Sequence, residues 1–526
     1  MKRKGILFVI VPLAVIVLGM IGYCGYLGYS AYEGLLTSLK MLKVEFGGIT
    51  NNFFVETARC LGIIFYFSLL YAILYALNNA IKLFLNVRHT DSIAVHGDSS
   101  MAQFCAKSIH GGKHCVQSDS KESFRAPKQI IWFSDDVKSM NFYENNKSFL
   151  AKDDVYIALS SIPLDGKSEE NVHFFNINEN IAVKYWAQHF ITSSKKVVII
   201  GSGALAEVIL EQALLMNVYS KTGSIKYHVI GDFSVYRAMH PALQDAVNLT
   251  HDELVFANNA WHLQMDEIKT ADRVILVGKS EDNTAIARLL NNYGIKAEIH
   301  LMAESDETKL LFQEEKVEVF GTLKELLGKD GDAIFQDEIH KAGKLLDATY
   351  GVMSEIIDNE KGVIKSENEE TLDKLYSKSK KEWLEGNRSW NGLSSFLKRS
   401  NYSAAQHSVV KEWILKKALT DNNSVISFED YVGSGVKGAL EFWSDLNNKT
   451  IIEELEEIEH LRWWRLYLLN NFTYNENVES TDKWRLRQNR NMKDYALLDE
   501  TTKRYDGMHY WLLAFKDTNA NNETTV

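Results

Sequence analysis

Cysteine is scarce in this chain, which excludes a disulfide scaffold. Only 4 cysteines occur in 526 residues, whereas disulfide-stabilised proteins are short and cysteine-dense, so the composition indicates a reducing compartment. Four residues that could ligate a metal lie close together in sequence: Cys105, His110, His114 and Cys115. Two glycines separate the histidines and no CxxC pair is present, so the alternative is that these are ordinary loop and core residues.

A long basic run is also absent, and acidic residues are in excess. The formal net charge is −11 and the isoelectric point is about 5.8. A protein that binds DNA or RNA presents a basic face to the phosphates. Nucleic acid is therefore excluded as the main partner.

The sequence lacks the motif sets of several enzyme classes. It contains no GxxxxGK[ST], no HExxH, no G-x-S-x-G and no kinase signature set, which argues against hydrolase or kinase chemistry. We therefore predict that the protein is not an enzyme. An NAD-dependent dehydrogenase is the alternative, because the chain has a glycine-rich turn at 201–206, but no substrate domain with a paired catalytic acid is evident.

Two apolar segments occupy the first 86 residues. Residues 5–29 contain no Asp, Glu, Lys or Arg, and residues 60–76 are also uncharged apart from their flanks. As a helix, the first segment exceeds the roughly 30 Å hydrocarbon layer of a bilayer. We expect a two-helix transmembrane hairpin over residues 1–89. The alternatives are a cleaved signal peptide, which the basic residues 2–4 would allow, and two buried helices of a soluble protein.

The flanking charges predict the orientation of this hairpin. Three basic residues precede the first segment and Lys82 and Arg88 follow the second, whereas the basic residues between the segments are offset by glutamates. The positive-inside rule then puts both termini in the cytosol of a bacterial inner membrane. Two helices cannot line a pore alone, so a homo-oligomer, a tetramer or larger, is expected if ions pass. Residues 32–52 have the length of a pore loop but lack TVGYG, which favours an extracytoplasmic linker.

The clearest nucleotide-binding pattern begins at residue 195. KKVVIIGSGALAEVILEQALL reads as a buried strand, a glycine turn and a helix. Gly201, Gly203 and Ala206 fill the G-x-G-x-x-G/A positions, where the glycines permit a tight turn and close approach of a phosphate. Asp232, at the end of the next strand, is the candidate for the ribose, although it lies farther along than usual. A purely structural turn is the alternative.

Strands and helices alternate on both sides of this turn. Further strands are expected at ADRVILVG, AEIHLMA and VEVF, which predicts a doubly wound parallel sheet over residues 193–330. The same order of strand, turn and helix recurs over residues 90–192, with a degraded turn at Gly97, Ser99 and Ala102. The segments that carry it are SIAVHGDSSMAQFCAKSI, QIIWF and DVYIALS. Because that turn lacks its second glycine, we expect the first domain to be structural.

Tandem sheets of this kind after a short membrane segment resemble a known family. NVHFFNINENIAVKYW and ADRVILVGKSEDNTAIARLL are similar to phrases of the TrkA-N or RCK regulators of potassium channels, including Castor/Pollux-like arrangements. The resemblance covers residues 92–328. It implies Rossmann-like domains that form a cytosolic ring and control ion flow.

The C-terminal part carries a second resemblance. After a helical connector at 331–447, whose apolar residues we expect in a core, IEELEEIEHLRWWRLYLLNNFTYN is similar to the helix and aromatic turn of the ryanodine-receptor (RyR) repeat domain. The departures are Asn471-Phe472 in place of Gly-Trp and the lack of a His-Pro loop. The domain is expected over 448–526, and the resemblance implies ligand-binding roles for His460, Arg462 and Trp463, with an orienting or core role as the alternative for His460. The aromatic side chains of Tyr474 and Trp484 are further candidate ligand residues.

Aromatic planes beside arginines suit a nucleobase with phosphates, and a small aromatic core is the alternative. We therefore predict an α/β protein with a transmembrane hairpin, tandem Rossmann-like domains and a helical RyR-like domain. Its expected function is a channel or pore-forming effector gated by a nucleotide-type ligand, NAD-derived or another nucleotide. A second-messenger-triggered effector that disrupts membranes in antiviral defence and a membrane-anchored sensor without a pore are the alternatives.

Overall fold

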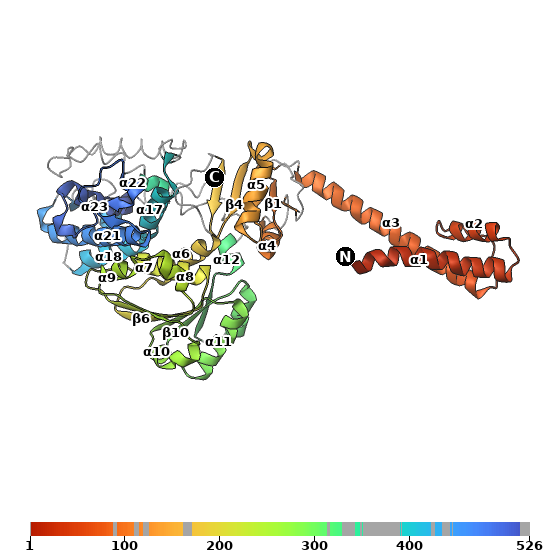
Figure 1. Cartoon of the computed structure of the whole chain (residues 1–526), viewed down its shortest axis with the longest axis horizontal. Helices are drawn as coiled ribbons and strands as arrows, with labels where there is room; N and C mark the ends of the chain where they lie inside the picture. The colour runs from red at the N-terminus through yellow and green to blue at the C-terminus, as the bar shows by residue number, and fades with distance from the viewer. Residues whose placement is uncertain are drawn as a thin grey trace. The chain divides into compact units, whose positions relative to one another are not determined.

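The computed structural model divides the chain into two units, Met1–Thr90 and Asp91–Val526, both drawn in Figure 1. It describes residues 2–87, 92–109, 115–118, 126–160, 171–312, 316–328, 342–347, 350, 390, 392–421, 427–433, 442–443 and 445–515.

The first unit is a bundle of helices held by small residues. A Cβ added at Gly19 would meet Ser38, one at Gly34 would meet Cys24, and one at Gly62 would meet the backbone of Met41. Close approach over small side chains is typical of helices packed in membranes. The elements are α1 (Lys2–Met20), the π-helical turn η1 (Ile21–Tyr26), α2 (Ala31–Met41) and α3 (Phe53–Val87).

Among the described residues, one helical segment is long and apolar enough to cross a bilayer, Phe53–Leu74 in α3. A shorter apolar segment among the residues whose side chains are described, Ile10–Tyr26, runs from α1 into η1. The two-span hairpin therefore stays a prediction. Helix α2 occupies part of the segment expected to be a linker, and its Ser30–Glu33 capping box fixes its first turn.

The first sheet of the second unit is parallel throughout, in the order β2-β1-β3-β4-β5. This 2-1-3-4-5 arrangement is a doubly wound fold. Its elements are β1 (Ile93–His96), α4 (Ser100–Ser108), β2 (Cys115–Ser118), β3 (Lys128–Ile131), α5 (Asp136–Leu150), β4 (Asp154–Ala158) and β5 (Val172–Phe175).

The second sheet is also parallel, in the order β11-β10-β9-β6-β7-β8. Counted from β8, this is the 3-2-1-4-5-6 order of Rossmann folds, which confirms the predicted doubly wound sheet. Its elements are β6 (Lys195–Ile200), α7 (Ala204–Met216), β7 (Ile225–Ile230), α8 (Ser234–Met239), α9 (Leu243–Asn248), β8 (Glu253–Ala257), η3 (Trp261–Gln264), α10 (Met265–Lys269), β9 (Arg273–Leu276), α11 (Ser280–Asn292), β10 (Glu298–Met302), η4 (Asp306–Phe312), β11 (Val317–Phe320) and α12 (Leu323–Leu327).

Helices cover both faces of this sheet, with α10 and α11 on one side and α7 and α9 on the other (Figure 1). Burial on both faces explains why residues 197–200 of β6 form a continuous apolar run. Helix α6 (Ile177–His189) follows β5 of the first sheet, yet its Tyr185 and Trp186 lie in the core of the second. This helix therefore connects the two sheets by packing as well as by sequence.

The C-terminal helices pack on α7 and α9 (Figure 1). Their core combines residues of the expected connector, such as Leu415 and Phe442, with residues of the expected RyR-like segment, such as Leu455 and Tyr510. The two segments thus share one core. The elements are α17 (Ser395–Gln406), α18 (Ser408–Asp421), α19 (Phe428–Gly433), η5 (Leu446–Asn448), α21 (Lys449–Leu469), β12 (Thr473–Tyr474), α22 (Lys483–Leu486), β13 (Gln488–Asn489), η6 (Tyr495–Leu497) and α23 (Glu500–Phe515).

Candidate ligand site

The carboxyl ends of β6, β7 and β9 meet where the strand order of the second sheet reverses. Gly201 follows β6 with φ 155°, and a Cβ there would lie 2.8 Å from the carbonyl carbon of Val277 at the end of β9. A Cβ at Gly231, which follows β7, would overlap the carbonyl oxygen of Gly201. Both glycines are needed to bring the strand ends together, and such a reversal is where doubly wound sheets bind ligands.

Gly203 has a different environment from Gly201. It adopts φ 87° and ψ −177° as the N-cap of α7, and a Cβ there would find no described atom within 4 Å. Among the described residues, no side chain caps the first turn of α7. The turn thus presents open backbone and helix N–H groups at the positive end of the helix dipole, as phosphate binding requires. Ala206 is fully buried where α7 meets the sheet, as a small residue at that position should be.

Asp232 lies at the neighbouring strand end and keeps its carboxylate at the surface. Its Oδ1 accepts hydrogen bonds from the backbone N–H and the hydroxyl of Ser234 at 3.0 and 2.7 Å, which lower the pKa of Asp232. Glu207, in the first turn of α7, has its pKa raised, mainly by burial and also by the Asp232 charge. Carboxylates accept hydrogen bonds and repel other anions. Asp232 and Glu207 therefore favour a ligand that places hydroxyl groups beside the turn, and they disfavour a second phosphate there.

A groove of about 710 Å³ is lined by residues that follow Asp232 in the sequence. Arg237 lies over the Phe256 ring at 5.2 Å from its centroid, so a cation and an aromatic plane line the same space. Sequence reasoning missed these residues, because their pairing depends on β8, which we did not predict. The groove is lined by Ser234, Arg237, Ala238, His240, Pro241, Leu243, Gln244, Leu254, Val255 and Phe256.

The corresponding turn of the first sheet is closed. A Cβ at Gly97 would overlap the carbonyl oxygen of Trp132, and the Ser99 hydroxyl donates to that same oxygen at 2.9 Å. Ser99 also caps α4 by accepting from the N–H of Ala102. The Ser99 hydroxyl is therefore bound within the protein, and the structural role of this turn stays a prediction.

An aromatic row follows one side of α21. The rings of His460 and Trp463 stack at 5.5 Å, those of Trp463 and Tyr467 lie 4.3 Å apart, and Tyr467 lies 6.4 Å from Trp484. Lys483 lies over Trp484 at 4.7 Å, and burial lowers the pKa of this lysine to about 8. The predicted residues His460, Trp463 and Trp484 thus belong to one row.

The predicted ligand residue His460 is held from both sides. Its Nε2 donates to the carbonyl oxygen of Lys493 at 2.8 Å, and its Nδ1 lies 3.3 Å from Asp506 Oδ2. Burial opposes protonation, but the Asp506 carboxylate outweighs it and raises the pKa of His460. Tyr474, in β12, is 47% exposed.

Arg462 is buried and only 1% exposed. Its Nε and Nη2 donate to the two carboxylate oxygens of Glu459 at 2.9 and 2.5 Å, and its Nη1 donates to the Ser403 hydroxyl. Glu459 also meets Lys411 Nζ at 2.8 Å and His509 Nε2 at 3.2 Å. The structure thus places Arg462 in an internal ion-pair cluster between helices.

Two contacts connect the segment after the Gly201–Gly203 turn and Asp232 to α21 through α8. His240, just after α8, places Nδ1 2.6 Å from the carbonyl oxygen of Leu469, and Asn471 donates its amide N–H to the carbonyl oxygen of Met239 at 2.8 Å. Helix α8 begins two residues after Asp232. The predicted residues thus form two groups, one at the turn and one on α21, joined by this short helix.

The metal site suggested by the sequence, at residues 105–115, lies only partly within the residues that the structure describes. Cys105 is buried in the core of the first sheet, whereas His110 and His114 lie outside the described residues. No family model and no curated protein matches this chain, so the TrkA-N and RyR resemblances stay predictions.

Proposed function

We propose that residues 91–526 bind a nucleotide-type ligand at the Gly201–Gly203 turn and thereby gate an oligomeric channel built from the first 87 residues. The observation that carries the proposal is the open backbone at Gly203, at the uncapped end of α7 and at the strand reversal of a Rossmann-ordered sheet. The turn of the first sheet serves as an internal comparison, since Ser99 stands there at the position of Gly203 and its side chain caps α4 at the N–H of Ala102.

The ligand chemistry follows from the groups around the turn. Phosphate oxygens accept hydrogen bonds from the first turn of α7, and ribose hydroxyls donate to Asp232. A base or a second charged group occupies the groove near Arg237 and Phe256. An NAD-derived molecule or another nucleotide supplies these groups together.

Transmission begins at α8. A ligand that binds Asp232 restrains the chain leading into α8, whose last residues contact the end of α21. Within the first unit, α3 continues as a helix to Val87, and β1 of the second unit begins at Ile93. The second unit has one arrangement for the open channel and another for the closed channel. A ligand that binds one arrangement more tightly shifts the equilibrium between open and closed channels by the difference in its binding free energy.

The membrane role rests on the apolar surface of the first unit. Ile10, Leu13 and Val17 of α1 and Ile64 and Phe67 of α3 each expose 50% or more of their surface. Exposed apolar side chains in such number require lipid or further copies of the chain as neighbours. One chain has too few helices to enclose a polar path, so the channel is a homo-oligomer.

The test is flux through proteoliposomes that hold the purified full chain, scanned against NAD, ADP-ribose, ATP and cyclic nucleotides. Gly203→Asp is the test variant and Gly294→Asp its control, since Gly294 also has positive φ and no described atom within 4 Å of an added Cβ. Ligand-dependent ion flux without dye release, lost only in Gly203→Asp, is expected. Dye release would favour a disruptive effector, and ligand binding without any flux would favour an anchored sensor.

A further inference from the structure

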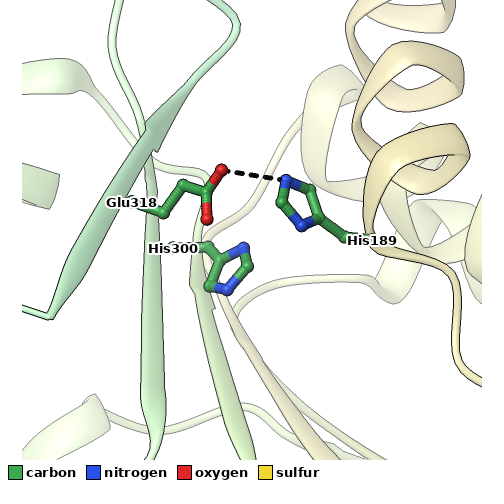
Figure 2. A group of neighbouring side chains, drawn as sticks. All are labelled: His189, His300 and Glu318. Carbon is green, nitrogen blue, oxygen red and sulfur yellow. Dashed lines mark ion pairs between the residues drawn. The ribbon is translucent and has the colours of Figure 1, made fainter.

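Among the described residues, one group of three potential metal ligands comes together, on the face of the second sheet that α6 covers. His189 is the last residue of α6, His300 lies in β10 and Glu318 in β11. His300 and Glu318 are register partners, so their side chains leave the sheet on the same face. Figure 2 shows the three side chains pointing toward one another.

The distances are close to those of a bound ion. One ligand atom from each residue lies within 4.8 Å of the others, and His189 Nε2 lies 3.2 Å from Glu318 Oε1. A tetrahedral ion with bonds of about 2.0–2.2 Å separates its ligand atoms by roughly 3.3–3.6 Å. Separations of up to 4.8 Å must therefore shorten by roughly 1 Å for all three residues to bind one ion.

The polar atoms of the group are poorly satisfied by the protein. His189 Nε2 is buried, and among the described residues it has no hydrogen-bond partner, because its approach to Glu318 lacks hydrogen-bond geometry. His300 is oriented by the Tyr185 hydroxyl, 3.1 Å from Nδ1. Buried histidine nitrogens seldom stay unpaired, and a carboxylate, a carbonyl or a hydroxyl commonly orients a metal-binding histidine.

Arg273 donates to the carbonyl oxygen of His189 at 2.6 Å, so a cation lies beside the group. Arg273 itself is paired with Glu298 at 3.0 Å, which offsets its charge toward an incoming cation. The Glu318 side chain is 52% exposed, so solvent reaches the group from that side.

We propose that His189, His300 and Glu318 bind a divalent transition-metal ion of the zinc class, with solvent at the fourth position. Two imidazoles and a carboxylate are a common zinc ligand set. The ion joins the end of α6 to β10 and β11. Because α6 connects the two sheets, metal binding would stiffen that connection. The second unit would then respond to two ligands, a metal ion here and a nucleotide at the turn at Gly203.

The experiment measures metal binding by the full chain in detergent. Protein stripped with a chelator is titrated with Co²⁺, whose visible absorption reports tetrahedral ligation, and bound Zn²⁺ is counted after desalting. The test variants are His189→Ala and Glu318→Gln, and the matched controls are His251→Ala and Glu281→Gln, which alter exposed residues elsewhere in the second sheet domain.

One ion per chain is expected for the wild type, for both controls and for Gly203→Asp, with at least roughly tenfold weaker binding in both test variants. Glu318→Gln keeps the shape of an exposed side chain, so its folding is expected to be normal. Binding that is absent in the wild type, or as tight in Glu318→Gln as in Glu281→Gln, would overturn the proposal. Since Gly203→Asp keeps the metal, failure of the nucleotide proposal would leave this result unchanged.

Discussion

Replacing Glu459 by Gln should destabilise the helical part of the body severely. Glu459 is the one carboxylate in contact with Arg462 and Lys411 among the described residues, and all three side chains are at most 1% exposed. Burial would raise the pKa of Glu459, but Arg462, His509 and Lys411 outweigh it and hold the pKa well below its usual range. The carboxylate therefore carries its charge at neutral pH.

The expected cost follows from the partners left behind. Glu459→Gln leaves two buried cations without a counter-charge, and removal of one partner of a buried ion pair costs about 3–5 kcal/mol. Glu453 lies on the same helix and pairs with Lys449 at the surface, at 3.7 Å. Glu453→Gln is the matched control, with an expected cost of about 0.5 kcal/mol or less.

The assay is urea unfolding of the full chain in detergent, followed by tryptophan fluorescence, with nucleotide binding measured on the same samples. Adding Lys411→Met to Glu459→Gln should recover part of the loss, because one uncompensated charge is removed. Two results together would contradict a structural role for the cluster. The first is that Glu459→Gln lowers the free energy of unfolding no more than Glu453→Gln does. The second is that Arg462→Ala abolishes nucleotide binding while the protein stays fully folded, which would show that Arg462 contacts the ligand.

Gly203→Ala should lower stability by about 1–3 kcal/mol, because φ 87° with ψ −177° is a conformation open almost only to glycine; an unchanged melting temperature would contradict this backbone geometry. Burial raises the pKa of Glu456 to about 7 from 4.5, so its contribution to stability is present below pH 4.5 and is lost as the pH rises through about 7. A pH series of melts should show that slope in the wild type and lose it in Glu456→Gln; equal slopes would refute it. Arg465 is fully buried and pairs with Asp252 at 3.2 Å, so Arg465→Met should lower the free energy of unfolding by about 3–5 kcal/mol. The variant should also be cleaved faster by proteases where α21 packs on the second sheet domain, and wild-type resistance to proteolysis would argue against this.

The sheets were predictable because their signals are local. The buried run of β6, the glycine turn and the helix α7 lie within one short segment, and the structure has them at the predicted positions. Strand β8 was missed, since it is a short edge strand with exposed residues at alternate positions. The strand order itself depends on pairing between distant segments, which periodicity does not report.

The side-chain clusters could not be predicted for the same reason. Arg462 and Trp463 are neighbours in sequence, but a helix turns them to different sides, and only the position of Lys411 on another helix shows which side is internal. The metal-ligand group combines the end of α6 with two strands far along the chain. Neither group has a spacing that a motif search can find.

The burial of α7 on two sides has a consequence for the evolution of this protein. Glu211 of α7 pairs with Arg399 of α17, and Arg465 of α21 donates to the carbonyl oxygen of Leu214. The core of the second sheet continues without a break into Phe396 and Leu466 of the C-terminal helices. Rossmann-type domains are often exchanged between proteins as portable parts, but this one would expose an apolar helix face if it were cut free. Recombination can therefore transfer the sheet and its C-terminal helices together, whereas a truncation between them should yield an insoluble fragment.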